Sequence, residues 1–227
     1  MTERTLIDND VALKAACYTL VEETVEVLTI DDVAPAMLGV GRFVIAKRIE
    51  RAKYIMDRNR ASAAFSRLLA RVLMIEPDDT ELSIAADLEA EANRRGLELD
   101  GGESQLLAVL ANRSCSFLVT GDKRAIVAMS RVAAKEADSR IMCFEQLVAC
   151  IVSAAGHDNV RVRVCGEPLA DRAVTSCFGC SLSEAPDPQY VLDGLASYSR
   201  HLNGEAPGVL SREGSFRGLV REKPQTP

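Results

Sequence analysis

The stretch that most constrains the fold is residues 99–126, LDGGESQLLAVLANRSCSFLVTGDKRAI. Apolar side chains recur at helical spacing over residues 103–111, which predicts a helix with one buried face. Residues 116–120 are short, apolar and rich in β-forming residues, as is typical of a buried parallel strand. Gly121 and Asp122 then end this strand and begin another helix. The stretch therefore predicts an α/β protein.

The same stretch places two carboxylates where ligands bind in such proteins. Glu103 lies in a first helical turn, and Asp122 follows the carboxyl end of a strand, outside which open α/β sheets bind their ligands. Two acids that converge there indicate a divalent-metal site. The structural alternative is that both residues serve the helices, because Asp is a common N-cap and Glu favours a first turn.

A third acid near the N-terminus supports the metal site. The short apolar strand predicted at residues 5–7 is followed at once by Asp8, and a helical pattern begins at Val11. Asp10 is the better N-cap for that helix, which leaves Asp8 to bind a ligand. We therefore expect Asp8, Glu103 and Asp122 to act together.

Composition excludes several classes of protein. The 227 residues are 48% hydrophobic and carry a net charge of −6, which is ordinary for one sizeable soluble core and disfavours a generally basic nucleic-acid binder. No apolar run reaches membrane-spanning length, and no signal-peptide pattern opens the chain. The odd number of cysteines, seven, favours reduced thiols and a cytoplasmic protein. Aromatic residues make up only 4%, too few for a broad base-stacking platform.

Three motifs in order, LIDND, DGGESQLLAVLA and FLVTGDKRAI, resemble those of the PIN-like nuclease domains, over about residues 4–150. The resemblance implies a Rossmann-like parallel sheet flanked by helices in residues 1–155, followed by a small, partly irregular C-terminal extension in residues 156–227. It also implies cleavage of RNA, less often of flap DNA, by a water that bound Mg²⁺ or Mn²⁺ activates.

By this resemblance, Asp8, Glu103 and Asp122 map onto the acidic metal-binding cluster of the family, and Thr120 onto the hydroxyl residue before the last acid. Many PIN-like domains carry a further Glu after the second strand. Here the corresponding region, APAMLGVGRFVIAKRIE, offers apolar residues or Gly, and Glu50 lies about two turns later. The alternative function is therefore a catalytically inactive PIN-like module that binds protein or RNA.

A basic segment precedes the central stretch. Residues 35–73, which we expect to be mostly helical, hold nine Lys and Arg against two acids. We interpret this excess as a surface that follows the phosphates of RNA, or of DNA, since the planar guanidinium of Arg grips phosphate oxygens. The alternative is a solvated helical face. The residues expected to bind nucleic acid are Arg42, Lys47, Arg48, Arg51 and Arg58.

The remaining elements follow from shorter patterns. Residues 25–30 fit either a second strand or the end of a helix, and residues 160–164, VRVRV, alternate as in an edge strand. From residue 203 we expect a frayed end. Helices are predicted near 80–95, 122–135, 146–155 and 188–202, and a last strand at 140–144.

Cysteines of the extension raise a further possibility. Cys177 and Cys180 form a CxxC, and with Cys165 and His157 they supply four potential zinc ligands. No second CxxC accompanies them, so packed thiols are the favoured interpretation. A zinc-stabilised interaction protein is the third candidate function. The extension is also the expected contact surface for a protein partner or a second copy.

Overall fold

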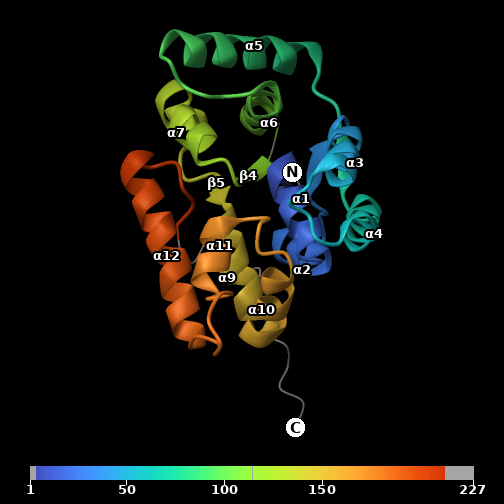
Figure 1. Ribbon diagram of the computed structural model, residues 1–227. Helices are drawn as coiled ribbons and strands as arrows, with labels where there is room; N and C mark the ends of the chain where they lie inside the picture. Colours follow the sequence, from blue (N-terminus) through green and yellow to red (C-terminus); the bar gives the residue numbers. More distant parts are fainter. Residues whose placement is uncertain (1–3, 114, 213–227) are drawn as a thin grey trace.

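The computed structural model describes residues 4–113 and 115–212 and shows an α/β fold (Figure 1). Five parallel strands form one sheet in the order β3-β2-β1-β4-β5, flanked by helices, as the sequence predicts. The strands are β1 Arg4–Ile7, β2 Ala36–Leu38, β3 Leu73–Ile75, β4 Cys115–Thr120 and β5 Ile141–Cys143. The helices are α1 Asn9–Cys17, α2 Val21–Leu28, α3 Gly41–Arg51, α4 Arg58–Leu69, α5 Asp79–Arg94, α6 Gly101–Asn112, α7 Lys123–Val132, α8 Ala134–Ala137, α9 Phe144–Ala155, α10 His157–Gly166, α11 Arg172–Cys177 and α12 Pro188–Glu205.

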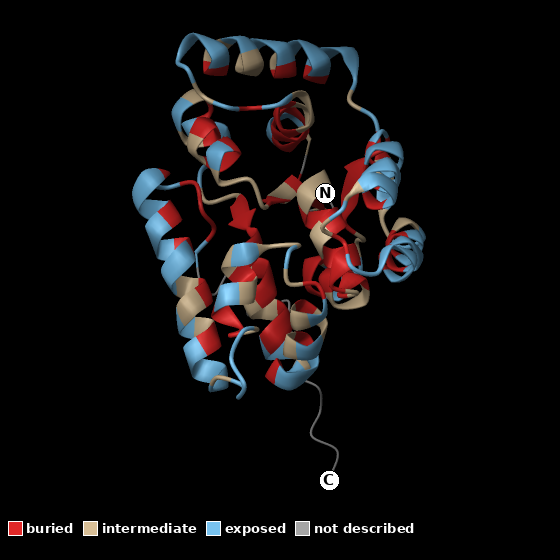
Figure 2. Ribbon diagram, in the orientation of Figure 1, coloured by how far each residue is buried: buried red, intermediate tan, exposed pale blue. Residues whose placement is uncertain are grey.

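The sheet buries both of its faces. Successive residues of a strand point to opposite sides, so Leu6 and Leu118 enter one core cluster while Ile7 and Val119 enter the other. Helices α5 to α8 cover the first of these faces, and α1 to α4 with α9, α10 and α11 cover the second. Figure 2 shows the buried residues gathered around the sheet and the exposed ones on the outer helices. Burial on both faces explains why the strands have continuous apolar sequences.

The C-terminal extension is built into this core. Val191 and Leu195 of α12 belong to the cluster around Ile7, and Leu202 of the same helix belongs to the opposite cluster. Beyond α12, Leu210 forms a parallel bridge with Ile141 of the edge strand β5. The described part of the extension is mainly helical. The frayed end predicted from residue 203 is wrong up to residue 212, because α12 continues to Glu205 and the apolar side chains of Ala206, Val209 and Leu210 are buried. Residues 213–227 lie outside the described part of the chain.

Two short strands were missed in the segment expected to be mostly helical. β2 and β3 are three residues each, too short to show the alternation or the apolar run that indicates a strand. Residues 25–28 belong to α2, with Val25 and Leu28 buried, so the helical alternative for 25–30 is right up to Leu28.

The edge strand predicted at residues 160–164 is wrong, because VRVRV lies in α10. Val160 and Val164 are one helical turn apart and fully buried, whereas Val162 between them is 73% exposed. A strand would have turned all three valines to one face. The alternating arginines instead reach other elements: Arg161 donates to the carbonyl oxygen of Phe178, and Arg163 pairs with Glu23.

The expectation that every thiol is reduced is also wrong, because Cys165 and Cys180 form a disulfide. Their Cα atoms lie 5.1 Å apart, in the ordinary range for such a bond. This pairing removes both residues from the zinc set considered with His157. Cys177, the other member of the CxxC, is a buried free thiol, as the packed-thiol interpretation predicts.

Among the described residues, the structure contains no helix with the length and apolar character needed to span a membrane.

Leu195→Ala tests whether the extension and the sheet unfold together. Leu195 is fully buried in the larger cluster, so its loss should lower the free energy of unfolding by about 2–5 kcal/mol in one cooperative transition. Leu182→Ala is the matched control, because Leu182 is 57% exposed and its truncation should cost no more than about 0.5 kcal/mol. Urea denaturation followed by circular dichroism measures both. A second transition that leaves the sheet at the wild-type midpoint would show independent units.

Candidate active site at the carboxyl end of the sheet

Pairing of β1 with β4 brings the ends of two distant segments together. Ile7 lies opposite Val119 in the parallel register, and the N–H of Asp8 donates to the Val119 carbonyl over 3.0 Å. Asp8 therefore stands beside Thr120, the last residue of β4. The structure thus brings together three of the predicted site residues, Asp8, Thr120 and Asp122, at the carboxyl end of the central strands.

Thr120 connects the two aspartates. Its buried hydroxyl donates to Oδ2 of Asp8 over 3.1 Å, and the same oxygen accepts the N–H of Asp122 over 3.2 Å. The other oxygen of Asp8, Oδ1, accepts the Asn9 N–H over 2.7 Å, so Asp8 is the N-cap of α1. The prediction that Asp10 caps this helix is wrong, because the strand ends one residue before Asp8 and the helix begins one residue after it.

Glu103 is held at the start of α6 by a capping box. Its Oε2 accepts the N–H of Asp100 over 3.1 Å, and Oδ1 of Asp100 accepts the N–H of Glu103 over 2.9 Å. The side chain is buried. Glu103 thus comes from a third element, α6, whose first turn lies near Asp8 and Asp122.

Asp122 caps α7 and has a cationic partner. It accepts the N–H groups of Arg124 and Ala125, and the Arg124 guanidinium lies 3.2 Å from its Oδ2. All three predicted metal ligands therefore also serve helix N-termini, where the helix dipole favours negative charge. The capping role, one of the two alternatives that the sequence posed, is thus present at all three side chains. Metal binding by them stays a prediction.

Asp10 lies next to this group and forms an ion pair with a lysine. Lys14 contacts Asp10 over 2.6 Å and Asp171 of the extension over 2.7 Å. Asp10 and Lys14 both pack against Gly121, where a side chain would collide with them. A glycine between Thr120 and Asp122 is therefore a requirement of close packing.

Burial distinguishes Asp8 and Glu103 from the other acids. Burial, with Asp10 nearby, raises the pKa of Asp8 to about 6. Burial also raises the pKa of Glu103 to about 8, assisted by the charges of Asp100, Asp8 and Asp122 and opposed by the Asp100 N–H. Within the described chain, neither Asp8 nor Glu103 forms an ion pair with a Lys, Arg or His.

Asp122 shows the opposite shift. Burial alone would raise its pKa, but the Arg124 side chain and the α7 N–H groups outweigh burial and lower it. The negative charge of Asp122 is thus compensated within the protein, and those of Asp8 and Glu103 are not.

The chemistry of this donor set fits Mg²⁺ or Mn²⁺. Carboxylate oxygens are hard ligands, and Mg²⁺ is commonly held by one or two carboxylates with water in its other positions. Over residues 4–113 and 115–212, no three His, Cys, Asp or Glu side chains lie close enough together to form a metal-holding group. Asp8 and Glu103 are the two predicted ligands without a cationic partner in the described chain, whereas Asp122 is paired with Arg124.

The region in which the resemblance implies a further glutamate includes the tightly packed start of α3. Gly41 opens α3 against the side-chain amide of Asn9, and a Cβ at residue 41 would collide with that amide. Glu50 is exposed near the far end of α3 and is not part of the acidic group. The sequence patterns did not indicate Glu76. It follows β3, and its side chain extends over Gly39, the residue after β2.

The basic segment gives α3 an exposed cationic stripe, which we define as Val44, Lys47, Arg48 and Arg51. These positions recur at helical spacing along one exposed side of the helix, next to its buried face. Within the described chain, no ion pair neutralises the three cations of the stripe. Together with Ala52 and Tyr54, the stripe lines an open hollow of about 360 Å³.

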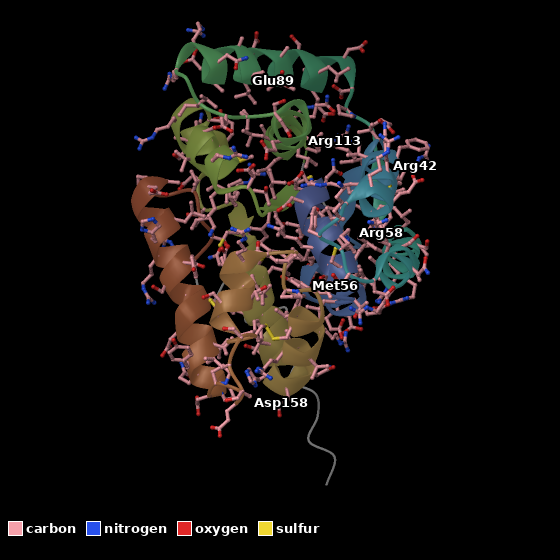
Figure 3. All side chains as sticks on the ribbon, in the orientation of Figure 1. Arg42, Met56, Arg58, Glu89, Arg113 and Asp158 are labelled. Atoms are coloured by element: carbon pink, nitrogen blue, oxygen red, sulfur yellow. A yellow bond between two sulfur atoms is a disulfide. The ribbon has the colours of Figure 1, made fainter. Side chains whose placement is uncertain are left out.

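Arg42 and Arg58, the other predicted nucleic-acid ligands, lie on the same side of the molecule (Figure 3). The Arg42 guanidinium is 4.6 Å from the centre of the Phe43 ring, which is 63% exposed. Arg58 donates to the carbonyl oxygen of Ala52 over 3.2 Å and remains exposed. Several other bases of the segment hold structural partners instead: Arg60 pairs with Glu167, and Arg67 with Glu22.

Comparisons of the chain with protein-family models, with curated proteins and with solved structures found no match.

Glu103→Gln tests the uncompensated charge. Because the folded chain binds this proton more tightly than the unfolded chain does, raising the pH from 4.5 to about 8 should progressively destabilise the metal-free wild type. The amide cannot ionise and can still accept the Asp100 N–H. The variant should therefore be about 1–3 kcal/mol more stable than wild type at pH 8 and similar at pH 4.5.

Urea denaturation in EDTA across this pH range measures the difference. Glu26→Gln, a change at an exposed glutamate of α2, is the control and should run parallel to wild type. If the free energy of unfolding of Glu103→Gln also changed with pH in parallel with that of wild type, the result would contradict a buried ionisable group at Glu103.

Proposed function

We propose that the protein is a metal-dependent nuclease whose metal site is built on Asp8 and Glu103. The observation that carries this proposal is the pair of buried carboxylates, without a cationic partner in the described chain, at the carboxyl end of a parallel sheet. Keeping such charges buried is costly, and a bound divalent cation would offset the cost. The PIN-like motifs in the sequence support the same conclusion.

Each residue has a defined task in this proposal. Asp8 and Glu103 hold the cation, and Thr120 orients Asp8 through its 3.1 Å hydrogen bond. Asp122 donates its N–H to the Thr120 hydroxyl oxygen and so helps to hold Thr120 in place. Bound there, Mg²⁺ or Mn²⁺ would supply an activated water and offset negative charge on the phosphate.

The cationic stripe supports nucleic acid as the substrate. α3 begins at Gly41, which packs on Asn9 beside Asp8, and the stripe follows the helix away from that point. Eleven residues of α3 extend about 16 Å, so a strand bound along the stripe would lead toward the acidic group. We propose RNA as the main substrate because the PIN-like motifs imply cleavage of RNA more often than of DNA.

Cleavage with Mn²⁺ tests the catalytic proposal directly. Wild type should cut mixed single-stranded RNA in millimolar Mn²⁺, and its melting temperature should rise with Mn²⁺. Asp8→Asn and Glu103→Gln should each abolish both effects, because each removes one of two ligands. The Glu26→Gln control should retain both.

A catalytically inactive binding module is the second candidate. It is favoured by the absence of a three-ligand group in the described residues and by the capping role of every predicted ligand. In that case wild type gains no stability from Mn²⁺ and cuts neither RNA nor DNA, yet still binds RNA. The contact role predicted for the C-terminal extension, with a protein partner or a second copy, stays a prediction.

The triple variant Lys47→Glu, Arg48→Glu, Arg51→Glu tests the stripe separately from catalysis. In EDTA, single-stranded RNA should bind it more weakly, and the slope of log affinity against log salt should become shallower by about 2. Fluorescence anisotropy over a salt series measures this slope. Arg200→Glu, a charge reversal at an exposed site on α12, should leave the slope unchanged. An unchanged slope in the triple variant would mean that the stripe is merely solvated.

A further inference from the structure

The disulfide closes a segment that holds two parts of the N-terminal region. We call residues 165–180, between the bonded Cys165 and Cys180, the strap. It runs from the end of α10 through α11, and its disulfide is visible in Figure 3 as the yellow bond near these helices. Two carboxylates of the strap, Glu167 and Asp171, extend to elements more than a hundred residues earlier in the sequence.

Glu167 holds the turn between α3 and α4. Although fully buried, its carboxylate accepts the N–H of Met56 over 2.7 Å and that of Asp57 over 2.8 Å. Arg60, in the first turn of α4, lies 3.5 Å from the same carboxylate. The Met56 side chain itself is 70% exposed, whereas Ile55 before it is buried in the larger core cluster. Hydrogen bonds from the strap therefore hold the backbone of Met56 and Asp57, next to the apolar anchor that Ile55 provides.

Asp171 holds α1. It pairs with Lys14, which also pairs with Asp10 beside Gly121. The strap thus contacts both the turn that follows the cationic stripe and the lysine next to the acidic group. One covalently closed segment of 16 residues joins these two regions.

The disulfide lies close to the first of these contacts. Only Gly166 separates Cys165 from Glu167, so the bond to Cys180 limits the movement of the Glu167 backbone. Both bonded cysteines are partly exposed, within reach of a thiol reagent. The neighbouring free thiol, Cys177, is buried, and burial raises its pKa to about 11, which keeps it unreactive.

We propose that the Cys165–Cys180 disulfide is a redox-controlled clamp on the turn between α3 and α4. A dithiol reductant attacks the bond, the two sulfurs accept two electrons and two protons, and the reductant becomes a disulfide. The strap then gains conformational freedom, Glu167 leaves the Met56 and Asp57 N–H groups for part of the time, and the turn loosens. Reoxidation restores the hold.

Hydrogen exchange at two amides tests the clamp in the full-length chain. In the oxidised protein the Met56 and Asp57 amides should be protected. After treatment with dithiothreitol they should exchange at least about fivefold faster, while the Asp8 amide, bonded within the sheet to Val119, should not change. The double variant Cys165→Ser, Cys180→Ser should behave as the reduced protein with or without reductant.

Cys150→Ser, at a free cysteine of α9 outside the strap, should respond to reductant as wild type does. Thiol counting after denaturation should give five free thiols before reduction and seven after it. Equal exchange of the two amides in oxidised and reduced wild type would overturn the clamp. Seven thiols in a protein never exposed to reductant would overturn it too.

A measurement of RNA binding separates this proposal from the proposed function. Only this measurement rests on the proposed function, and the clamp itself does not. In EDTA, the reduced wild type should bind single-stranded RNA less tightly than the oxidised protein, because the loosened turn follows directly on Arg51. Faster amide exchange without a loss of RNA affinity would support the clamp and count against the role of the stripe. Unchanged exchange overturns the clamp whatever the RNA affinity does.

Discussion

The parallel pairing of β1 with β4 is the constraint on which the rest of the structure depends. It joins residues separated by more than a hundred positions and sets Asp8 beside Thr120. Each strand then passes at once into a helix, so backbone N–H groups gather at the same edge of the sheet. These N–H groups stabilise negative charge, which allows carboxylates to lie where apolar strands end.

The acids at this edge differ in how fully their charge is compensated. Asp122 has Arg124, and Asp10 has Lys14, whereas Asp8 and Glu103 have hydrogen bonds alone. The difference decides their chemistry, because a buried carboxyl without a cation either keeps its proton or attracts a positive ligand. A metal-binding role for Asp8 and Glu103 is the proposal that makes use of this charge.

The C-terminal extension connects parts of the fold that are distant in the sequence. Its apolar helices complete both core clusters, and its two strap carboxylates hold the turn after α3 and the lysine near Asp10. A covalent bond between Cys165 and Cys180 closes the segment that carries them. The extension is therefore part of the surroundings of the candidate site.

The sequence by itself determined the α/β class, the central strands and the places of three acids at strand ends and helix starts, because continuous apolar runs followed by an acid are local patterns. It could not decide the short strands β2 and β3, which are below the length at which periodicity appears. It also could not decide whether VRVRV forms a strand or a helix, since alternating valines fit both. Packing against the core determines which of the valines are buried. Only the tertiary structure showed that Cys165 bonds Cys180 and that Lys14 pairs with Asp171, because contacts between distant residues depend on how the helices pack around the sheet.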